Sequence, residues 1–234
     1  MTTSRPLLLA ALAALVGCAA PPDHFHTLRP AVAAAPADAR ETPLLLAIGP
    51  VTVPDSLARD EWVIRTGDTG ATVYAHQLWT QGLGADVAQS LVDYLNRGGL
   101  PDGLWADAGP TGSGSGADLD RPAPLRVRVQ VLRLDSMLTP APAVADQLRW
   151  TIECLPANAA PGAVDAGRYR VVRTAVRESG GPASASDAAV DESQRRFAQL
   201  ARAHSDALRQ VAEDVAAALR ATAGERAKSC IALR

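Results

Sequence analysis

Alternating apolar and polar residues mark several stretches of this chain as strands with one buried face. The clearest stretch covers residues 125–131, and the same alternation returns at 148–154 and 168–176. In the last stretch the alternation slips at Val171-Val172, which predicts a β-bulge. Shorter apolar runs that end at Gly, Pro or Asp predict further strands at residues 44–53, 62–66, 72–78 and 104–106.

Two other stretches repeat their apolar residues every three or four positions, as on one face of an amphipathic helix. The first helix is expected to begin near Ala85 and to end at Gly98-Gly99, and the second to run from Glu192 to about Ala223. The elements therefore follow the order strands, helix, strands, helix. This order predicts an α+β fold, in which a mainly antiparallel sheet carries two amphipathic helices packed on one face.

The N-terminal residues follow the pattern of a bacterial lipoprotein signal peptide. Arg5 precedes an apolar run that ends at Leu15-Val16-Gly17-Cys18. The run is too short for a bilayer core, which needs ~20 residues. We therefore expect residues 1–17 to be removed and Cys18 to carry lipid chains such as palmitate. Because Ala19 stands where an aspartate would signal inner-membrane retention, we expect the outer membrane, with the protein on its periplasmic face.

Three further segments are expected after the signal peptide. Residues 18–43 combine the lipidated cysteine with a tether rich in Ala and Pro, whose random-coil reach is ~25–30 Å. Only residues 25–28 of this tether are expected to dock on the folded part. Residues 44–223 form the predicted α+β domain, and residues 224–234 form a C-terminal tail.

Charge and motifs exclude several classes of function. Removing residues 1–17 takes away Arg5 and no acidic residue, so the net charge changes from −2 to −3. Such a chain is not expected to bind nucleic acid, which requires clustered basic residues. Neither a catalytic motif nor a cofactor motif is found. His24 and His26 lack convergent partners for a metal ion, and His204 lies on an apolar helix stripe, where a structural histidine is expected.

Three groups of residues leave two interpretations open. In an oxidising periplasm Cys154 and Cys230 either form a disulfide or remain separate thiols. Two arginine pairs either bind anions or keep exposed strand faces soluble, and they are Arg126/Arg128 and Arg168/Arg170. The four tryptophans either line a groove for a lipid or small ligand or belong to the core, and they are Trp62, Trp79, Trp105 and Trp150.

The middle of the chain carries a recognisable succession of motifs. Residues 48–57 read Ile-Gly-Pro-Val-Thr-Val-Pro-Asp-Ser-Leu, residues 63–68 read Val-Ile-Arg-Thr-Gly-Asp, and residues 77–83 lead through Trp79 into the first helix. Together with the lipidation motif and the Phe-His-Thr-Leu at 25–28, this succession resembles the PqiC family of ABC-type transport auxiliary lipoproteins. The chain departs from the family pattern at Ser56, where tyrosine is usual, and at Gln81-Gly82, where an acid-Pro pair is common.

The resemblance implies a non-catalytic accessory of an MCE/ABC-type intermembrane lipid transport system. Such a lipoprotein would dock an MCE-domain periplasmic protein (PqiB-like) at the outer membrane, and it is compatible with a homo-oligomer. The alternative is a lipid- or small-ligand-binding envelope lipoprotein that acts without an MCE partner. Four residues are candidates either for the partner surface or for the core, and they are Trp79, Leu83, Val53 and Pro54.

Overall fold

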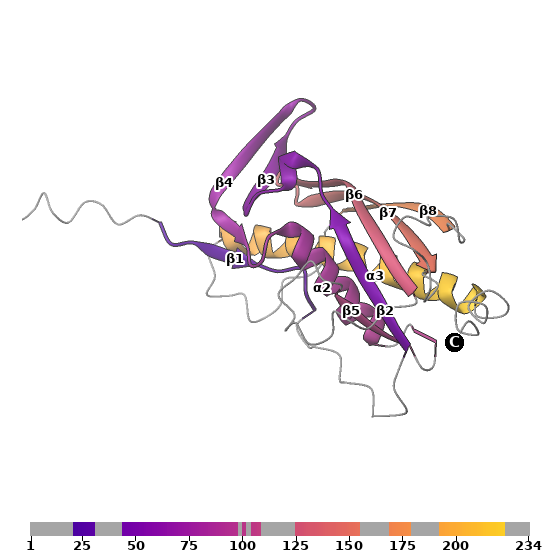
Figure 1. Cartoon of the computed structure of the whole chain (residues 1–234). Coiled ribbons are helices and arrows are strands. Elements are labelled where there is room, and N and C mark those ends of the chain that lie inside the picture. The colour runs from indigo at the N-terminus through magenta and orange to yellow at the C-terminus, as the bar shows by residue number, and fades with distance from the viewer. Residues whose placement is uncertain are drawn as a thin grey trace, which may run out of the picture.

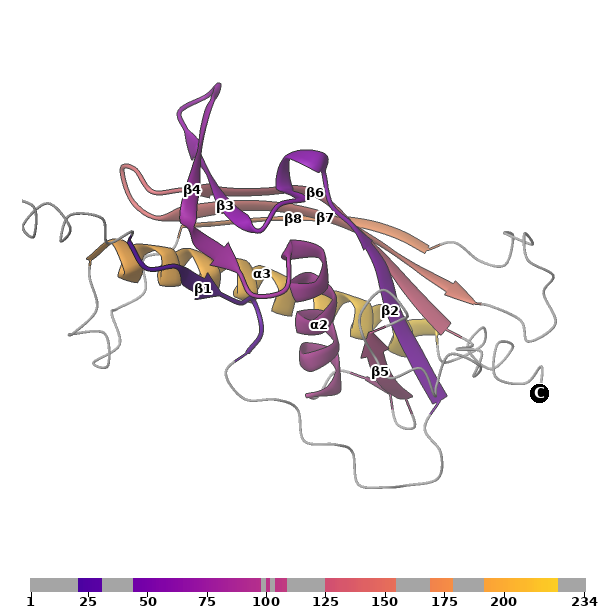
Figure 2. The ribbon, with the colours of Figure 1, turned by 60° about the vertical axis from the view of Figure 1, so that its left-hand side comes forward.

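The computed structural model describes residues 21–30, 44–97, 100–101, 104–108, 125–154, 169–178 and 192–222. Within these ranges eight strands form one sheet, and two helices pack side by side on one of its faces (Figures 1 and 2). The elements are β1 (His24–His26), β2 (Leu44–Thr52), the 3-10 turn η2 (Asp55–Leu57), β3 (Glu61–Thr66), β4 (Gly70–Trp79), α2 (Leu83–Asn96), β5 (Leu104–Ala108), β6 (Leu125–Met137), β7 (Ala143–Cys154), β8 (Tyr169–Glu178) and α3 (Glu192–Thr222).

The sheet is mixed and is organised around β6. One edge of β6 pairs antiparallel with β7, which in turn pairs antiparallel with β8. The other edge pairs parallel with β2 along its first half and with β3 through Ile64 and Ser136 near its end. Beyond β2 lies β5, which is parallel, and beyond β3 lie β4, which is antiparallel, and β1, which is parallel to β4.

The α+β class is confirmed, but the prediction of a mainly antiparallel sheet is wrong. Four of the seven strand pairings are parallel. Parallel neighbours need a crossover connection, and the one from β2 to β5 runs through β3, β4 and α2. Alternation along a strand shows which side is buried, but it carries no information about the direction of a distant neighbour.

The predicted strands and helices are found at the expected places, although several bounds differ: β6 and β7 are longer than predicted, and the predicted bulge is absent from the β7–β8 ladder. The ladder between β7 and β8 runs without a register shift, so the bulge predicted at Val171-Val172 is wrong. A β-branched residue suits either face of a strand, so two valines in succession do not require an extra residue. The shift in this part of the sheet falls instead on β6, between Val131 and Arg133.

The core lies between the sheet and the helices. α2 packs on β2 and β5, while α3 packs on α2, β7 and β8. The apolar stripe of α3 is buried along its length, from Phe197 through Leu208 to Leu219, because its residues step by three or four positions. Neither helix in the described part of the chain is long and apolar enough to cross a membrane.

Candidate functional site

The segment that follows the predicted lipidation site is part of the folded domain. β1 pairs with the end of β4, and its three residues lie opposite Gln77, Leu78 and Trp79. Leu28 has no exposed surface and belongs to the core. The prediction that residues 25–28 dock is therefore confirmed. The structure thus holds residues 23–29 against the domain, within the segment that the sequence assigned to a tether.

Polar contacts fix this N-terminal segment on both sides of β1. Arg29 Nε donates to Asp93 Oδ2 of α2 at 2.9 Å, and Ser205 Oγ of α3 donates to the Leu28 carbonyl oxygen at 2.8 Å. The remaining contacts join Asp23 to His76 (2.8 Å), His24 to Gln194 (2.7 Å), His26 to Gln77 (2.6 Å) and Thr27 to Asp86 (3.3 Å). Since these partners come from β4, α2 and α3, the segment ties three elements together.

Burial shifts the pKa values of two groups in and against this segment. Burial lowers the pKa of His26, although the hydrogen bond to Gln77 partly offsets the effect and the nearby His24 adds to it. Burial raises the pKa of Asp86, against the opposing effect of the hydroxyls of Thr80 and Thr27 and the charge of Arg29. Burial disfavours the charged form of each group, so each group destabilises the folded protein when it becomes charged. The stability of this segment's packing therefore depends on pH.

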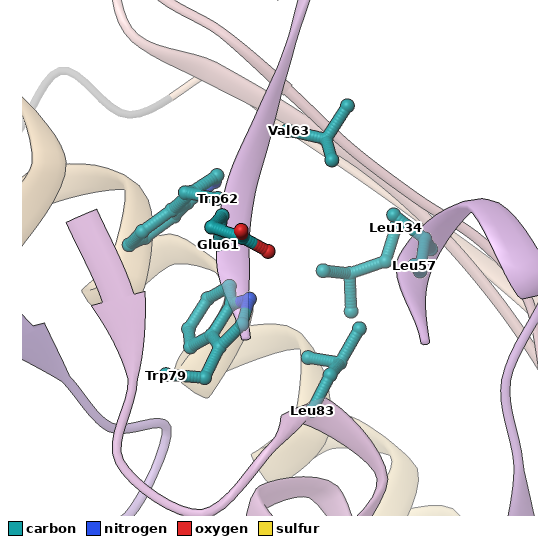
Figure 3. A pocket seen from close by; sticks show the side chains of 7 residues that line it. All are labelled: Leu57, Glu61, Trp62, Val63, Trp79, Leu83 and Leu134. Atoms are coloured by element: carbon teal, nitrogen blue, oxygen red, sulfur yellow. The ribbon is translucent and has the colours of Figure 1, made fainter. Parts of the chain in front are cut away.

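A shallow pocket opens between η2, β3 and the start of α2 (Figure 3). The Trp62 and Trp79 rings stack at 4.2 Å between centroids, and Leu83 lies below them. The lining residues are Leu57, Glu61, Trp62, Val63, Trp79, Leu83 and Leu134. The space open to the centre of a water-sized sphere is only about 10 Å³, room for one water molecule at most. A lipid acyl chain does not fit this pocket.

The structure divides the four candidate partner residues between two environments. Trp79 is 4% exposed and Leu83 is 2% exposed, so both belong to the core and form the floor of the pocket. Val53 packs partly buried against that core, and Pro54, beside η2, is also partly buried. Of the four candidates, only Val53 and Pro54 therefore keep more than a few per cent of their surface exposed, and the η2 turn follows them.

A buried polar network joins β3, β6, β7 and α3. Trp62 Nε1 donates to Ser136 Oγ at 2.8 Å, and this oxygen lies 2.8 Å from His204 Nε2. His204 Nδ1 lies 2.8 Å from Asp146 Oδ1. Serine, histidine and aspartate in this order are the parts of a hydrolase triad. Here, however, all three side chains are at most 1% exposed, so no substrate reaches the serine.

Of the four residues in this network, the sequence analysis singled out Trp62 and His204 and missed Ser136 and Asp146. His204 was expected to be structural because it lies on an apolar helix stripe, and it is wholly buried. Ser136 and Asp146 were missed because polar residues are usually exposed. Their positions in the alternation along the strands could have revealed them. Each occupies a position on the buried face, Ser136 two residues after Leu134 and Asp146 between Val144 and Leu148.

The other sequence candidates lie apart from one another. Trp150 is buried like Trp62 and Trp79, whereas Trp105 is partly buried. Arg126 and Arg128 follow the face of β6 away from the helices, where Arg128 pairs with Glu153 at 2.7 Å. Among the described residues, no three His, Cys, Asp or Glu side chains are placed to hold a metal ion. Cys154 ends β7, and Cys18, Arg168 and Cys230 lie outside the described ranges, so the disulfide remains a prediction.

Comparison with known proteins adds a family to this geometry. No curated protein matches the sequence. A solved structure titled as an uncharacterised protein is 14% identical, with a TM-score of 0.56 over 85% of this chain and 99% of that one. Protein XCC0632 from Xanthomonas campestris is 16% identical, with a TM-score of 0.52 over 82% and 92% of the two chains. Identities this low show the fold alone.

The family match covers the elements described above. The model of the ABC-type transport auxiliary lipoprotein component family aligns with residues 26–216, from the end of β1 through most of α3. It includes the docked Leu28, the pocket and the sealed Ser136–His204–Asp146 network. This chain therefore belongs to the family of ABC-type transport auxiliary lipoprotein components.

Proposed function

We propose that this auxiliary lipoprotein docks an MCE-domain periplasmic protein (PqiB-like) at the outer membrane and takes no part in catalysis. The observation that carries the proposal is the family match over residues 26–216, behind a lipidation motif at residues 15–18. An accessory of a transport system needs an anchor and a binding surface but no reaction centre. The burial of Ser136, the serine that contacts His204, agrees with that role.

The anchor in this proposal is a lipidated Cys18 at the new N-terminus, after removal of residues 1–17. Several acyl chains bind a bilayer stably, whereas one chain binds only reversibly. The periplasmic face of the outer membrane is proposed because no aspartate follows Cys18. Incorporation of labelled palmitate, and its loss in Cys18→Ser, tests the anchor independently of any partner.

The partner surface is proposed to lie at Val53, Pro54 and the η2 turn. Asp55 and Ser56 are exposed there, and the core residues Trp79 and Leu83 support the turn from below through Leu57. A turn of this kind offers a partner a rigid, mostly polar contact with an apolar base. Direct binding of a lipid is less well supported, because the pocket beside the turn holds one water molecule at most.

Co-purification from detergent-solubilised envelopes tests the docking role. Wild-type protein should retain the MCE-domain protein, and Ser56→Arg should reduce its recovery by about tenfold, as expected for a charge placed in an interface core. Ala221→Arg is the matched control, because Ala221 is also exposed but lies at the far end of α3. Recovery that is equal for the two variants contradicts the assigned surface. Failure of palmitoylated wild type to retain the expressed partner contradicts docking itself. The mass of the purified protein shows whether copies also assemble.

A further inference from the structure

The link between the proposed lipid anchor and the domain is shorter than the tether predicted over residues 18–43. Among the described residues, Asp23 is the first that contacts the domain, through a surface pair with His76, and it lies five positions after Cys18. A fully extended chain covers at most ~3.6 Å per residue, so Asp23 stays within about 18 Å of the lipidated sulfur. A free 25-residue tether would let the domain turn in any direction. A link of this length keeps one end of the domain near the bilayer.

The end that stays near the bilayer is defined by contacts. His24 lies against Gln194 in the first turn of α3, and Arg196 donates a hydrogen bond to the Leu138 carbonyl oxygen. β1, the start of α3 and the turn between β6 and β7 therefore gather at one end of the molecule, as Figure 2 shows. The opposite end carries the start of β2 and the end of α3.

Phe25 is the apolar group exposed at that end. Its flanking residues His24 and His26 are tied to Gln194 and Gln77, and β1 places the Phe25 side chain on the other side of the strand. Phe25 is 63% exposed, and among the described residues the only other large apolar side chain with comparable exposure is Val73, at 45%. Because its neighbours are fixed, the Phe25 ring stays exposed and is available to bind an apolar surface.

We propose that Phe25 inserts into the surface of the bilayer that holds Cys18, so that the β1 end of the domain faces the membrane. Phe25 lies seven positions after Cys18, which is at most about 25 Å of extended chain. In segments held at a membrane, apolar side chains such as Phe, Trp and Leu bury themselves at the boundary between headgroups and acyl chains. This inference rests on the lipid anchor of the proposed function and adds an orientation to it.

Val73 provides a matched control for this orientation. It lies in β4 opposite Val63, in the hairpin of β3 and β4 that stands away from the rest of the sheet (Figures 1 and 2). It is exposed and apolar like Phe25, but it lies four residues along β4 from Gln77, the partner of His24, which is about 13 Å of strand away from β1. A general affinity of exposed apolar groups for lipid would affect both positions, whereas the proposed orientation affects Phe25 alone.

The test uses the full acylated protein in vesicles of phosphatidylethanolamine and phosphatidylglycerol that contain a spin-labelled lipid. A fluorophore is attached at Phe25→Cys or Val73→Cys, in a background with Cys154→Ser and Cys230→Ser. The spin label should quench position 25 at least about twofold more than position 73. Palmitate incorporation and flotation with the vesicles establish the anchor beforehand.

Each outcome decides the inference. Anchored protein with no quenching at either position, or with equal quenching at both, overturns the membrane-facing assignment of the β1 end and leaves the anchor and the docking role standing. Protein that carries no palmitate and does not float overturns the anchor and this inference together. Photocrosslinking to lipid from benzoylphenylalanine at positions 25 and 73 repeats the comparison with the native cysteines, in case the serine background does not fold.

Discussion

His204 Nε2 lies 2.8 Å from Ser136 Oγ, and neither side chain has any exposed surface. The hydroxyl also accepts the Trp62 indole N–H, and the other imidazole nitrogen faces Asp146. Buried polar groups are stable only when each donor and acceptor has a partner. The network therefore fixes the position of α3 against β3, β6 and β7 more specifically than apolar contacts do.

Replacing Ser136 with alanine should destabilise the protein by about 2 kcal/mol, because it leaves the Trp62 N–H and His204 Nε2 buried without a partner. Urea unfolding measures the change. Ser56→Ala, on the exposed η2 turn, is the control and should change the free energy of unfolding by less than about 0.5 kcal/mol. Equal stability of Ser136→Ala and wild type contradicts the role given to the network.

A fluorophosphonate probe should not label Ser136 in the native protein. The reagent must reach the hydroxyl from solvent, and Ser136 has no exposed surface. Intact mass spectrometry measures labelling directly. A stoichiometric adduct that disappears in Ser136→Ala would show that the network is an active site and that the non-catalytic role is wrong.

Leu28→Ala should cost about 3 kcal/mol, since the side chain is fully buried in the core. Phe25→Ser, three residues earlier on the exposed side of the same segment, should change stability by less than about 0.5 kcal/mol. Thermal or urea unfolding compares the two variants. If both changes are equally mild, the segment next to the anchor does not contribute to the core.

The pH dependence of stability should include a contribution from His26. Burial lowers its pKa below the ordinary 6.5, so the unfolded chain binds the proton more tightly than the folded one. The contribution is therefore present above pH 6.5 and is lost as the pH falls through the pKa of the folded protein. His26→Gln, which can still donate to Gln77, should be less stable than wild type at about pH 8, and its deficit should shrink by about pH 5.

Urea unfolding of wild type and His26→Gln at both pH values measures this difference. His76→Gln is the control, because the His76 side chain is 43% exposed and pairs with Asp23 at the surface. A deficit of His26→Gln that stays constant or grows towards acid pH would mean that burial does not hold His26 neutral.

Two glycines at the start of α2 should respond in opposite directions to alanine. Gly82 has a φ of 73°, a conformation that costs other residues about 1 kcal/mol, so Gly82→Ala should destabilise the protein. Gly84 lies inside the helix, and a Cβ there would meet the Val51 carbonyl oxygen at 3.7 Å, an ordinary contact. Gly84→Ala should stabilise the protein by about 0.5 kcal/mol. Destabilisation by both changes, measured by thermal unfolding, contradicts the conformational explanation.

Local patterns predicted most of the elements, because each helix or strand shows its own periodicity in the sequence. The alternation along β6 and the stripe along α3 depend only on which side of an element is buried. The strand predicted at 125–131 ended too early, because the alternation breaks at Val131-Leu132, where the ladder with β7 shifts its register. In the structure β6 continues to Met137, since Arg65 pairs with Asp135 and the buried network satisfies Ser136.

Relationships between distant residues could not be predicted in this way. The parallel pairing of β2 with β6 joins Leu46 to Leu125, and nothing near either residue specifies the other. The same holds for the triad-like network, whose members are 58 and 68 positions apart. The docking of residues 25–28 was predicted from four residues alone, but its partners on β4, α2 and α3 were not.

The N-terminal segment is synthesised first, but its contacts with the domain can form only late in folding. Its contacts reach 51 residues ahead to Gln77 and 170 residues ahead to Gln194. The N-terminal segment therefore cannot complete its contacts until α3 has been synthesised. Once the contact between His24 and Gln194 forms, residue 24 is fixed to the domain, so the free reach of the N-terminus shortens at this last step of folding.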